Sequence, residues 1–151
     1  MDSDDAVEAD GPEFIDMLGA RFEVVARMGP RDGDTALIRA RMADGKTVPL
    51  HSPVDPECFH IISGEIEVFL AGEKPLWHVV ETGQSLLVAD GVQHAVRNKD
   101  GEPADLILAT NNRLARYFRE AGRPVTSSVD SRPPSPEDVQ RIIQVSEPYG
   151  Y

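Results

Sequence analysis

Short runs of alternating apolar and polar residues, separated by turn signals, restrict the fold of this chain more than any other feature. The clearest run is 35–42, where Ala36 and Ile38 face one side and Leu37 and Arg39 the other. About nine short strands with a turn every 8–12 residues are typical of a β-sandwich or closed barrel. Further runs lie at 48–51, 59–62, 65–71, 76–80, 85–88, 94–98 and 104–110. The pattern predicts an all-β domain.

The segments that join these runs carry their own signals. Ser63-Gly64 is a turn between 59–62 and 65–71, so we expect these two runs to form a hairpin. Residues 14–26 contain only short apolar groups broken by Gly19, and we expect this segment to lie across a sheet.

Two helices are predicted after the last strand. Asn111-Asn112 can cap the first, which ends at Gly122 and should pack on the outside of the barrel. Ser135-Pro136-Glu137-Asp138 starts the second, which should run to about Ser146. The apolar side chains are Leu114, Tyr117, Phe118 and Ala121 in the first helix and Val139, Ile142, Ile143 and Val145 in the second.

The length of 151 residues is that of one ordinary domain. Six acidic residues crowd the first 13 positions, a composition that favours disorder. We therefore expect a disordered acidic tail at 1–13, a barrel with its following helix at 14–122, and a linker with the C-terminal helix at 123–151.

The charge excludes some functions. Lys and Arg number 15 against 26 Asp and Glu, and the net charge of −11 argues against nucleic acid and anionic membranes as partners. There is neither a signal-peptide pattern nor an apolar run of membrane-spanning length, so we expect a cytoplasmic protein. The single cysteine, Cys58, cannot form an internal disulfide, and we interpret it as a buried apolar side chain rather than a nucleophile.

Three side chains of the kind that hold a divalent metal lie at the ends of three predicted strands. His51 comes late on one strand, Glu57 early on the next, and His94 starts a later strand. If the proline-rich bend at 53–56 preserves parity, all three face the barrel interior and His60 points away. His60 would replace a ligand only if its strand carried a bulge.

Other candidates have structural interpretations. We expect His78 to be an ordinary strand residue and Trp77 to lie in the core or in a subunit contact. We place Arg97 on the outer face of the sheet and expect Asn98 to satisfy backbone groups at a turn.

The spacing of these residues resembles the cupin family. The first cupin motif is Gly, five residues, His-x-His, three or four residues, Glu, six residues, Gly, and here it reads Gly45, His51, Pro53, Glu57 and Gly64. Pro53 stands where the motif has its second His.

The second cupin motif is Gly, five residues, Pro-x-Gly, two residues, His, three residues, Asn. Here it reads Gly83, Ala89 in place of Pro, Gly91, His94 and Asn98, so eight of ten fixed positions match. The chain looks like a small bacterial single-domain cupin resembling quercetin dioxygenases. The resemblance implies a double-stranded β-helix, a jelly-roll-like barrel, with C-terminal helices packed outside.

The family's ligand set carries over to His51, Glu57 and His94, while Pro53 offers no donor atom for a fourth position. Two His and one carboxylate still bind Fe(II)-type metals and leave open positions for substrate and O₂. The metal implied is Fe, Mn, Ni, Co or Zn. The alternative is that no metal is bound and that the three side chains are polar groups in an apolar pocket.

The function that the resemblance implies is dioxygenation of an enol or phenolic substrate, with Glu57 as the base in a cavity lined by Phe59, Ile61, Val96 and Leu106. A redox-neutral isomerase or lyase at the same site needs only a Lewis acid and a base. A metabolite-binding cupin without turnover is the non-enzymatic alternative. We also expect a homodimer, because Leu37 and Phe69 lie on outer strand faces.

Overall fold

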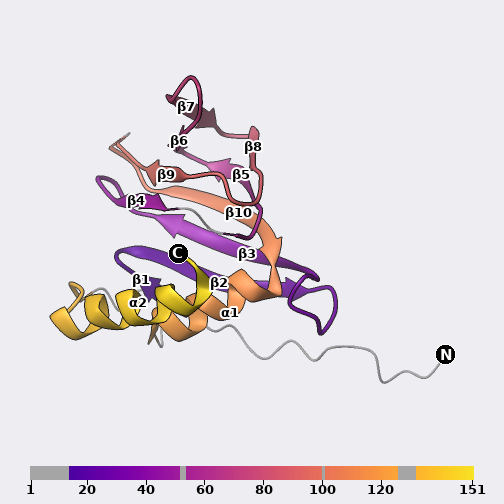
Figure 1. Ribbon diagram of the computed structural model, residues 1–151. Helices are drawn as coiled ribbons and strands as arrows, with labels where there is room; N and C mark the ends of the chain where they lie inside the picture. Colours follow the sequence, from indigo (N-terminus) through magenta and orange to yellow (C-terminus); the bar gives the residue numbers. More distant parts are fainter. Residues whose placement is uncertain (1–13, 52–53, 100, 126–131) are drawn as a thin grey trace.

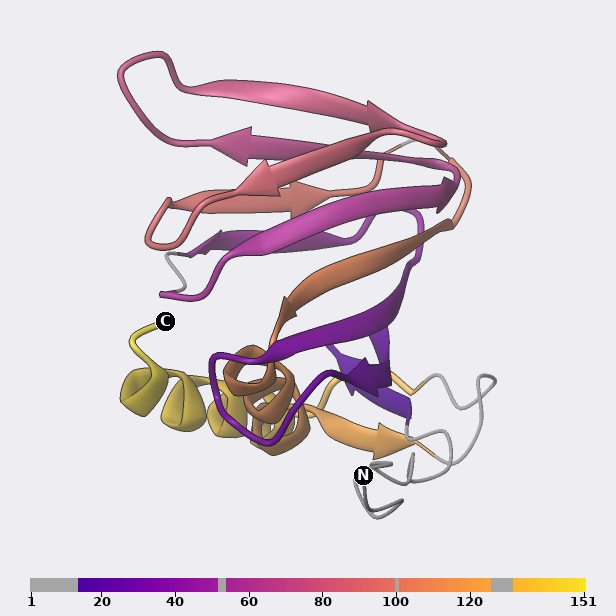
Figure 2. The same ribbon diagram turned by 90° about the vertical axis from the view of Figure 1, so that its right-hand side faces the viewer.

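Two antiparallel sheets pack face to face and enclose the core of the molecule (Figures 1 and 2). The computed structural model describes residues 14–51, 54–99, 101–125 and 132–151. The predicted acidic tail at 1–13, Pro53 and part of the predicted linker lie outside the described residues. The all-β prediction and the jelly-roll-like arrangement with two C-terminal helices are confirmed.

The larger sheet has seven strands and the smaller has four. In spatial order the larger contains β11 (Arg123–Val125), β1 (Phe14–Met17), β2 (Ala20–Arg27), β3 (Thr35–Met42), β10 (Ala104–Asn111), β5 (Glu57–Ser63) and β8 (Ser85–Val88). The smaller contains β4 (Thr47–His51), β9 (His94–Arg97), β6 (Glu65–Leu70) and β7 (Leu76–Glu81).

The core forms where the alternating residues of both sheets meet. Ile38, Ile61 and Leu108 from the larger sheet and Ile66 and Val68 from the smaller are almost completely buried. In β3 the burial alternates along the strand as the sequence predicts, with Ala36, Ile38, Ala40 and Met42 buried.

The predicted hairpin at Ser63-Gly64 is wrong. β5 pairs with β10 and β8, whereas β6 pairs with β7 and β9, so this turn carries the chain from one sheet to the other. Gly64 has φ of 81°, and an added Cβ would lie 2.8 Å from the carbonyl oxygen of Pro103. Glycine is therefore required here by both the backbone conformation and the close approach of the chain that leads into β10.

The segment 14–26 does not lie across a sheet but belongs to one. β1 and β2 form a hairpin through Leu18-Gly19, and β2 pairs along β3. Leu18 adopts a φ of 54°, an uncommon conformation for a non-glycine residue. Residues 123–125, which the sequence places in the linker, add strand β11 to the edge of this sheet beside β1.

Helix α1 (Asn112–Ala121) has the cap and the buried stripe that the sequence predicts. The side chain of Asn111 accepts a hydrogen bond from the backbone N–H of Leu114 at 3.0 Å. Phe118 stacks on Phe22 of β2 with ring centroids 4.3 Å apart. The helix therefore packs on strands of the larger sheet, beside β1, β2 and β11 in the lower part of Figure 2.

Helix α2 (Pro136–Tyr149) packs on α1. Ser135 and Asp138 form the predicted capping box, and the hydrogen bond from Arg132 to Asp138, together with the bond from the Ser135 backbone, holds the pKa of the Asp138 carboxyl well below its usual range. The helix continues past Ser146 to Tyr149. Ile142 and Val145 pack against the core, but Val139 and Ile143 are exposed. Neither described helix is long and apolar enough to span a bilayer.

Candidate metal centre

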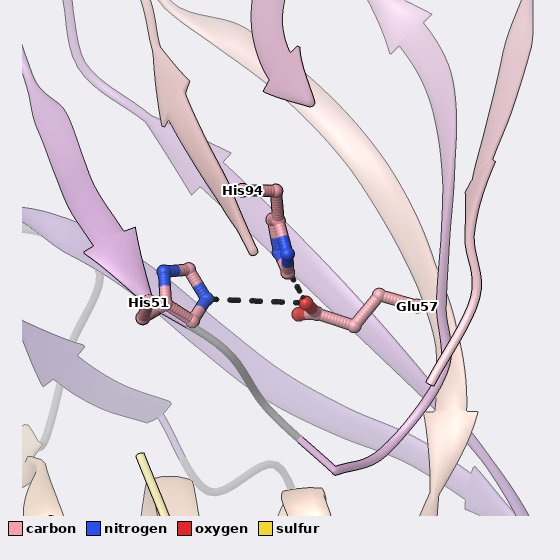
Figure 3. Close-up of side chains that lie close together, drawn as sticks. All are labelled: His51, Glu57 and His94. Carbon is pink, nitrogen blue, oxygen red and sulfur yellow. Dashed lines mark ion pairs between the residues drawn. The ribbon is translucent and has the colours of Figure 1, made fainter. Parts of the chain in front are cut away.

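His51, Glu57 and His94 come together at one end of the barrel from three strands in two sheets (Figure 3). His51 ends β4 and lies directly opposite His94 on β9. Glu57 is the first residue of β5 in the other sheet. The predicted parity is confirmed, since Glu57, Phe59 and Ile61 are buried. His60 faces away and bonds to the hydroxyl of Ser85 at 2.7 Å.

The ligand atoms are close enough to share one ion. Nε2 of His94 lies 2.6 Å from Oε2 of Glu57, and Nε2 of His51 lies 4.0 Å from the same oxygen. The two imidazole rings are 4.3 Å apart between centroids, and all three ligand atoms lie within 4.8 Å of one another. A divalent metal bonds imidazole nitrogen at about 2.0–2.1 Å, so small side-chain adjustments would complete the coordination.

Backbone carbonyls orient both imidazoles. Nδ1 of His51 lies 2.8 Å from the carbonyl oxygen of Pro49, and Nδ1 of His94 lies 2.9 Å from that of Val92. A carbonyl oxygen can only accept a hydrogen bond, so we assign the proton of each neutral ring to Nδ1. Nε2 then carries the lone pair and faces Glu57, which is the form that binds a metal.

Two of these atoms are buried without a hydrogen bond of acceptable geometry. His94 is fully buried and Glu57 is 5% exposed, yet neither Nε2 of His94 nor Oε2 of Glu57 has a hydrogen-bond partner among the described atoms. A lone pair and a carboxylate oxygen 2.6 Å apart repel each other unless a cation lies between them. That cation is either a proton on His94 or a metal ion, and the donor set suits a divalent transition metal.

This environment shifts the pKa values of His51 and His94 in opposite directions. Burial lowers the pKa of His51, assisted by His94, and this outweighs the opposing effects of Glu57 and Pro49. Burial also acts to lower the pKa of His94, but the carboxylate of Glu57 beside its Nε2, together with the Val92 carbonyl, outweighs burial and raises that pKa. As pH falls, His94 therefore takes up a proton before His51 in the metal-free centre.

An apolar cavity of about 210 Å³ opens beside the cluster. Phe59, Val96 and Leu106 line it, as the sequence predicts, whereas Ile61 lies deeper in the core. The other apolar wall residues include Met17, Leu18, Phe22, Val48, Leu114, Tyr117, Phe118, Ile142 and Tyr151. Helices α1 and α2 thus form part of the wall.

Sequence reasoning missed a polar network next to the cluster. The carboxylate of Asp55, two residues before Glu57, accepts hydrogen bonds from Asn111 at 2.8 Å, from Arg113 at 2.6 Å and from the hydroxyl of Tyr151. Asp55 is 5% exposed. Nothing in the motif spacing indicates this network, because its donors lie in α1, its cap and the segment after α2.

The remaining candidates mostly lie where the sequence places them. Arg97 is on the outer face, 3.7 Å above the ring of Trp77, and Asn98 donates to the carbonyls of Met42 and Glu102. His78 is half-buried on β7. Cys58 is half-buried on the outer face of β5 rather than buried in the core, because its neighbours Glu57 and Phe59 take the inward positions.

The fold is a jelly-roll barrel, and a His-Glu-His cluster that could hold a metal ion lies inside one end of it. Residues 38–110 match the family model described as the cupin domain. This stretch, which runs from β3 to β10 and makes up most of the barrel, is therefore a cupin domain.

Solved structures with the same fold differ widely in sequence. KdgF from Halomonas sp. is 18% identical, with a TM-score of 0.55 over 70% of this chain and 90% of that one. A variant of oxalate decarboxylase from Bacillus subtilis is 20% identical, with a TM-score of 0.58 over 67% of this chain and 27% of that one. The Drosophila melanogaster CENP-C cupin domain is 16% identical, with a TM-score of 0.56 over 65% and 74%. The search of curated proteins finds no match.

Proposed function

We propose that this protein is a metal-dependent small-molecule cupin that acts as a dioxygenase on a small enol or phenolic substrate. The observation that carries the proposal is the buried pair of Nε2 of His94 and Oε2 of Glu57, which face each other at 2.6 Å without hydrogen-bond geometry at the end of an apolar cavity. His51, Glu57 and His94 would hold the metal. A bound divalent metal would act as a Lewis acid and bring O₂ and substrate together.

Residues of the chain orient the two imidazoles, supply a base and exclude water from the cavity. The carbonyls of Pro49 and Val92 keep both Nε2 lone pairs directed at the centre. In the proposal, Glu57 is the catalytic residue that accepts the proton of the substrate hydroxyl. The apolar walls exclude water, and their low polarity strengthens the interaction of the substrate anion with the cationic centre.

The cavity restricts the size of the substrate. Its volume of about 210 Å³ is below the usual range of ligand pockets, roughly 300–1,000 Å³. This space favours a single-ring phenol or a small enediol over a three-ring flavonol, the substrate that a quercetinase-like reaction would use.

Two other functions use the same residues. A redox-neutral isomerase or lyase needs only the Lewis acid and Glu57, and the oxalate decarboxylase among the structural neighbours shows that this fold accommodates chemistry on a small carboxylate. A metabolite-binding role without turnover is favoured by Pro53, which removes one ligand of the cupin motif.

Oxygen consumption separates these functions. The purified protein is stripped of metal, loaded in turn with Fe(II), Mn(II), Ni(II), Co(II) or Zn(II), and supplied with single-ring phenols, small enediols and a flavonol. Dioxygenation predicts O₂ uptake with one redox-active metal and the small substrates, and its loss in Glu57→Gln. Turnover without O₂ uptake supports the isomerase or lyase. Failure to take up any metal contradicts both enzymatic proposals.

We also propose a homodimer, with the outer face of the larger sheet as its interface. Leu37, Ala109, Cys58 and Leu87 lie side by side across β3, β10, β5 and β8, and Leu87 is 67% exposed. Phe69, on the smaller sheet, instead packs against Trp77. Sedimentation equilibrium of the protein and of Leu87→Lys tests this, and a monomer at all concentrations contradicts it.

A further inference from the structure

Tyr151 lies where the far end of the chain meets the bend that leads to Glu57. It lines the cavity, and its hydroxyl donates to Asp55. Its ring packs edge-on against Tyr117, with centroids 4.6 Å apart, and lies parallel to Tyr149 at 5.9 Å. Figure 2 shows the end of the chain directly beneath the start of β5.

Arg113 ties this contact together from helix α1. One guanidinium nitrogen donates to Asp55 at 2.6 Å and lies 3.5 Å from the hydroxyl of Tyr151, while the other donates to the carbonyl of Tyr149 at 2.7 Å. A single cation thus bridges the bend before Glu57 and the C-terminal end of α2. Because Asp55 is nearly buried, these bonds are shielded from water and are stronger than surface pairs.

The backbone just before Tyr151 contains two residues that end helix α2, Pro148 and Gly150. Pro148 lies inside α2 and cannot donate the intrahelical hydrogen bond of its turn. Gly150 follows in the left-handed conformation with φ of 79°. Pro148 thus removes one hydrogen bond from the last turn of α2, while the bonds from Gly150 to Glu147 and from Tyr151 to Ser146 cap that turn.

We propose that Tyr151 is the residue that closes the cavity over the His51–Glu57–His94 cluster and sets the size of the ligand that fits. Asp55 is a positioning residue, since it holds Tyr151 in place and fixes the bend from which Glu57 projects. A ligand enters when the hydroxyl of Tyr151 leaves Asp55 and the segment swings on Pro148 and Gly150. This inference deepens the proposed small-molecule function and rests on it for the identity of the ligand.

The cover can be tested without metal or substrate. Diethyl pyrocarbonate acylates accessible imidazole nitrogens, and peptide mass spectrometry of the metal-free protein reports each histidine separately. We expect Tyr151→Ala and Asp55→Asn to speed modification of His51 and His94 several-fold relative to His60 and His78, which lie outside the cluster. An unchanged ratio in Tyr151→Ala overturns the proposal.

Two tyrosines at the same helix end give a matched pair of variants. Tyr151→Phe removes the hydroxyl bound to Asp55, whereas Tyr149→Phe removes a hydroxyl bound to Arg116 and Glu120 outside the cavity. Only the first should speed modification of His94. Equal effects of the two variants would mean general loosening of α2 and would contradict the assigned role of Tyr151.

Ligand size is measured on the Zn(II)-loaded protein by calorimetric titration with phenol, 4-tert-butylphenol and 2-naphthol. We expect the unmodified protein to bind phenol and Tyr151→Ala to bind all three. An identical size limit in both proteins overturns the role of Tyr151 in selection. If the histidine modification responds as expected but none of the three binds to either protein, the cover stands, its role in ligand selection is overturned, and the proposed phenolic substrate is wrong.

Discussion

Nε2 of His94 lies 2.6 Å from Oε2 of Glu57, although the two residues belong to different sheets. The contact lies at one end of the barrel and joins a fully buried imidazole to a nearly buried carboxylate. A cation between the two atoms is the condition that makes the arrangement stable. In the metal-free protein this cation is a proton on His94 at pH values below the raised pKa of that imidazole, and in the loaded protein a metal would replace it.

Removal of a ligand should therefore remove the metal. We expect His94→Ala and Glu57→Gln to weaken Co(II) affinity by more than about 100-fold, because loss of a mere supporting partner already costs 10–100-fold. His51→Ala should weaken it as well. Competition with a coloured chelator measures the affinity. His60→Ala is the control, because His60 bonds to Ser85 on the outer side, and a comparable loss in that variant would contradict the assigned ligand set.

The two cluster histidines should titrate on opposite sides of the ordinary value of 6.5 in metal-free protein. The raised pKa of His94 means that its protonation adds stability below pH 6.5, and this is lost as pH rises through its folded pKa. The lowered pKa of His51 means that its neutral form adds stability above pH 6.5, which is lost as pH falls through its folded pKa.

Nitrogen-detected NMR of labelled imidazoles follows both titrations. A metal competes with the proton on His94, so metal affinity should rise with pH until His94 is deprotonated. If Glu57→Gln leaves the pKa of His94 raised, the carboxylate is not its cause. If both histidines titrate at their ordinary value, the cluster is not assembled in solution as described.

Strand periodicity and the motif spacing predict which side chains of the candidate centre face the interior, and the structure brings His51, Glu57 and His94 together. Alternation along β5 puts Glu57 inside and His60 outside, and the structure agrees. The Asp55–Tyr151 bond joins residues 96 positions apart, and no periodic pattern links them. Ser63-Gly64 misleads because the same turn residues serve a hairpin and a crossing between sheets, and only the long-range pairing of β5 with β10 and β8 and of β6 with β7 and β9 distinguishes the two.

Gly122 should be needed for packing rather than for backbone freedom. Its φ is −79°, which any residue adopts, but an added Cβ would lie 2.2 Å from Cγ2 of Ile15 and 2.7 Å from the carbonyl oxygen of Phe118. We expect Gly122→Ala to lower the free energy of unfolding by about 1–3 kcal/mol or more, as overpacking does. Urea denaturation measures it. In Gly33→Ala, where nothing lies within 4 Å of the added Cβ, the change should stay within about 0.5 kcal/mol.

Pro53→His should restore the fourth ligand of the cupin motif. Pro53 lies outside the described residues, so the expectation rests on the spacing between His51 and Glu57, where the family has its second His. An added imidazole should tighten Co(II) binding by about tenfold or more and shift the visible absorption towards a higher coordination number. Pro53→Ala frees the backbone in the same way but adds no donor, and it should leave both measurements unchanged. Equal tightening in both variants would show that proline restrains the bend and that a side chain at position 53 does not reach the metal.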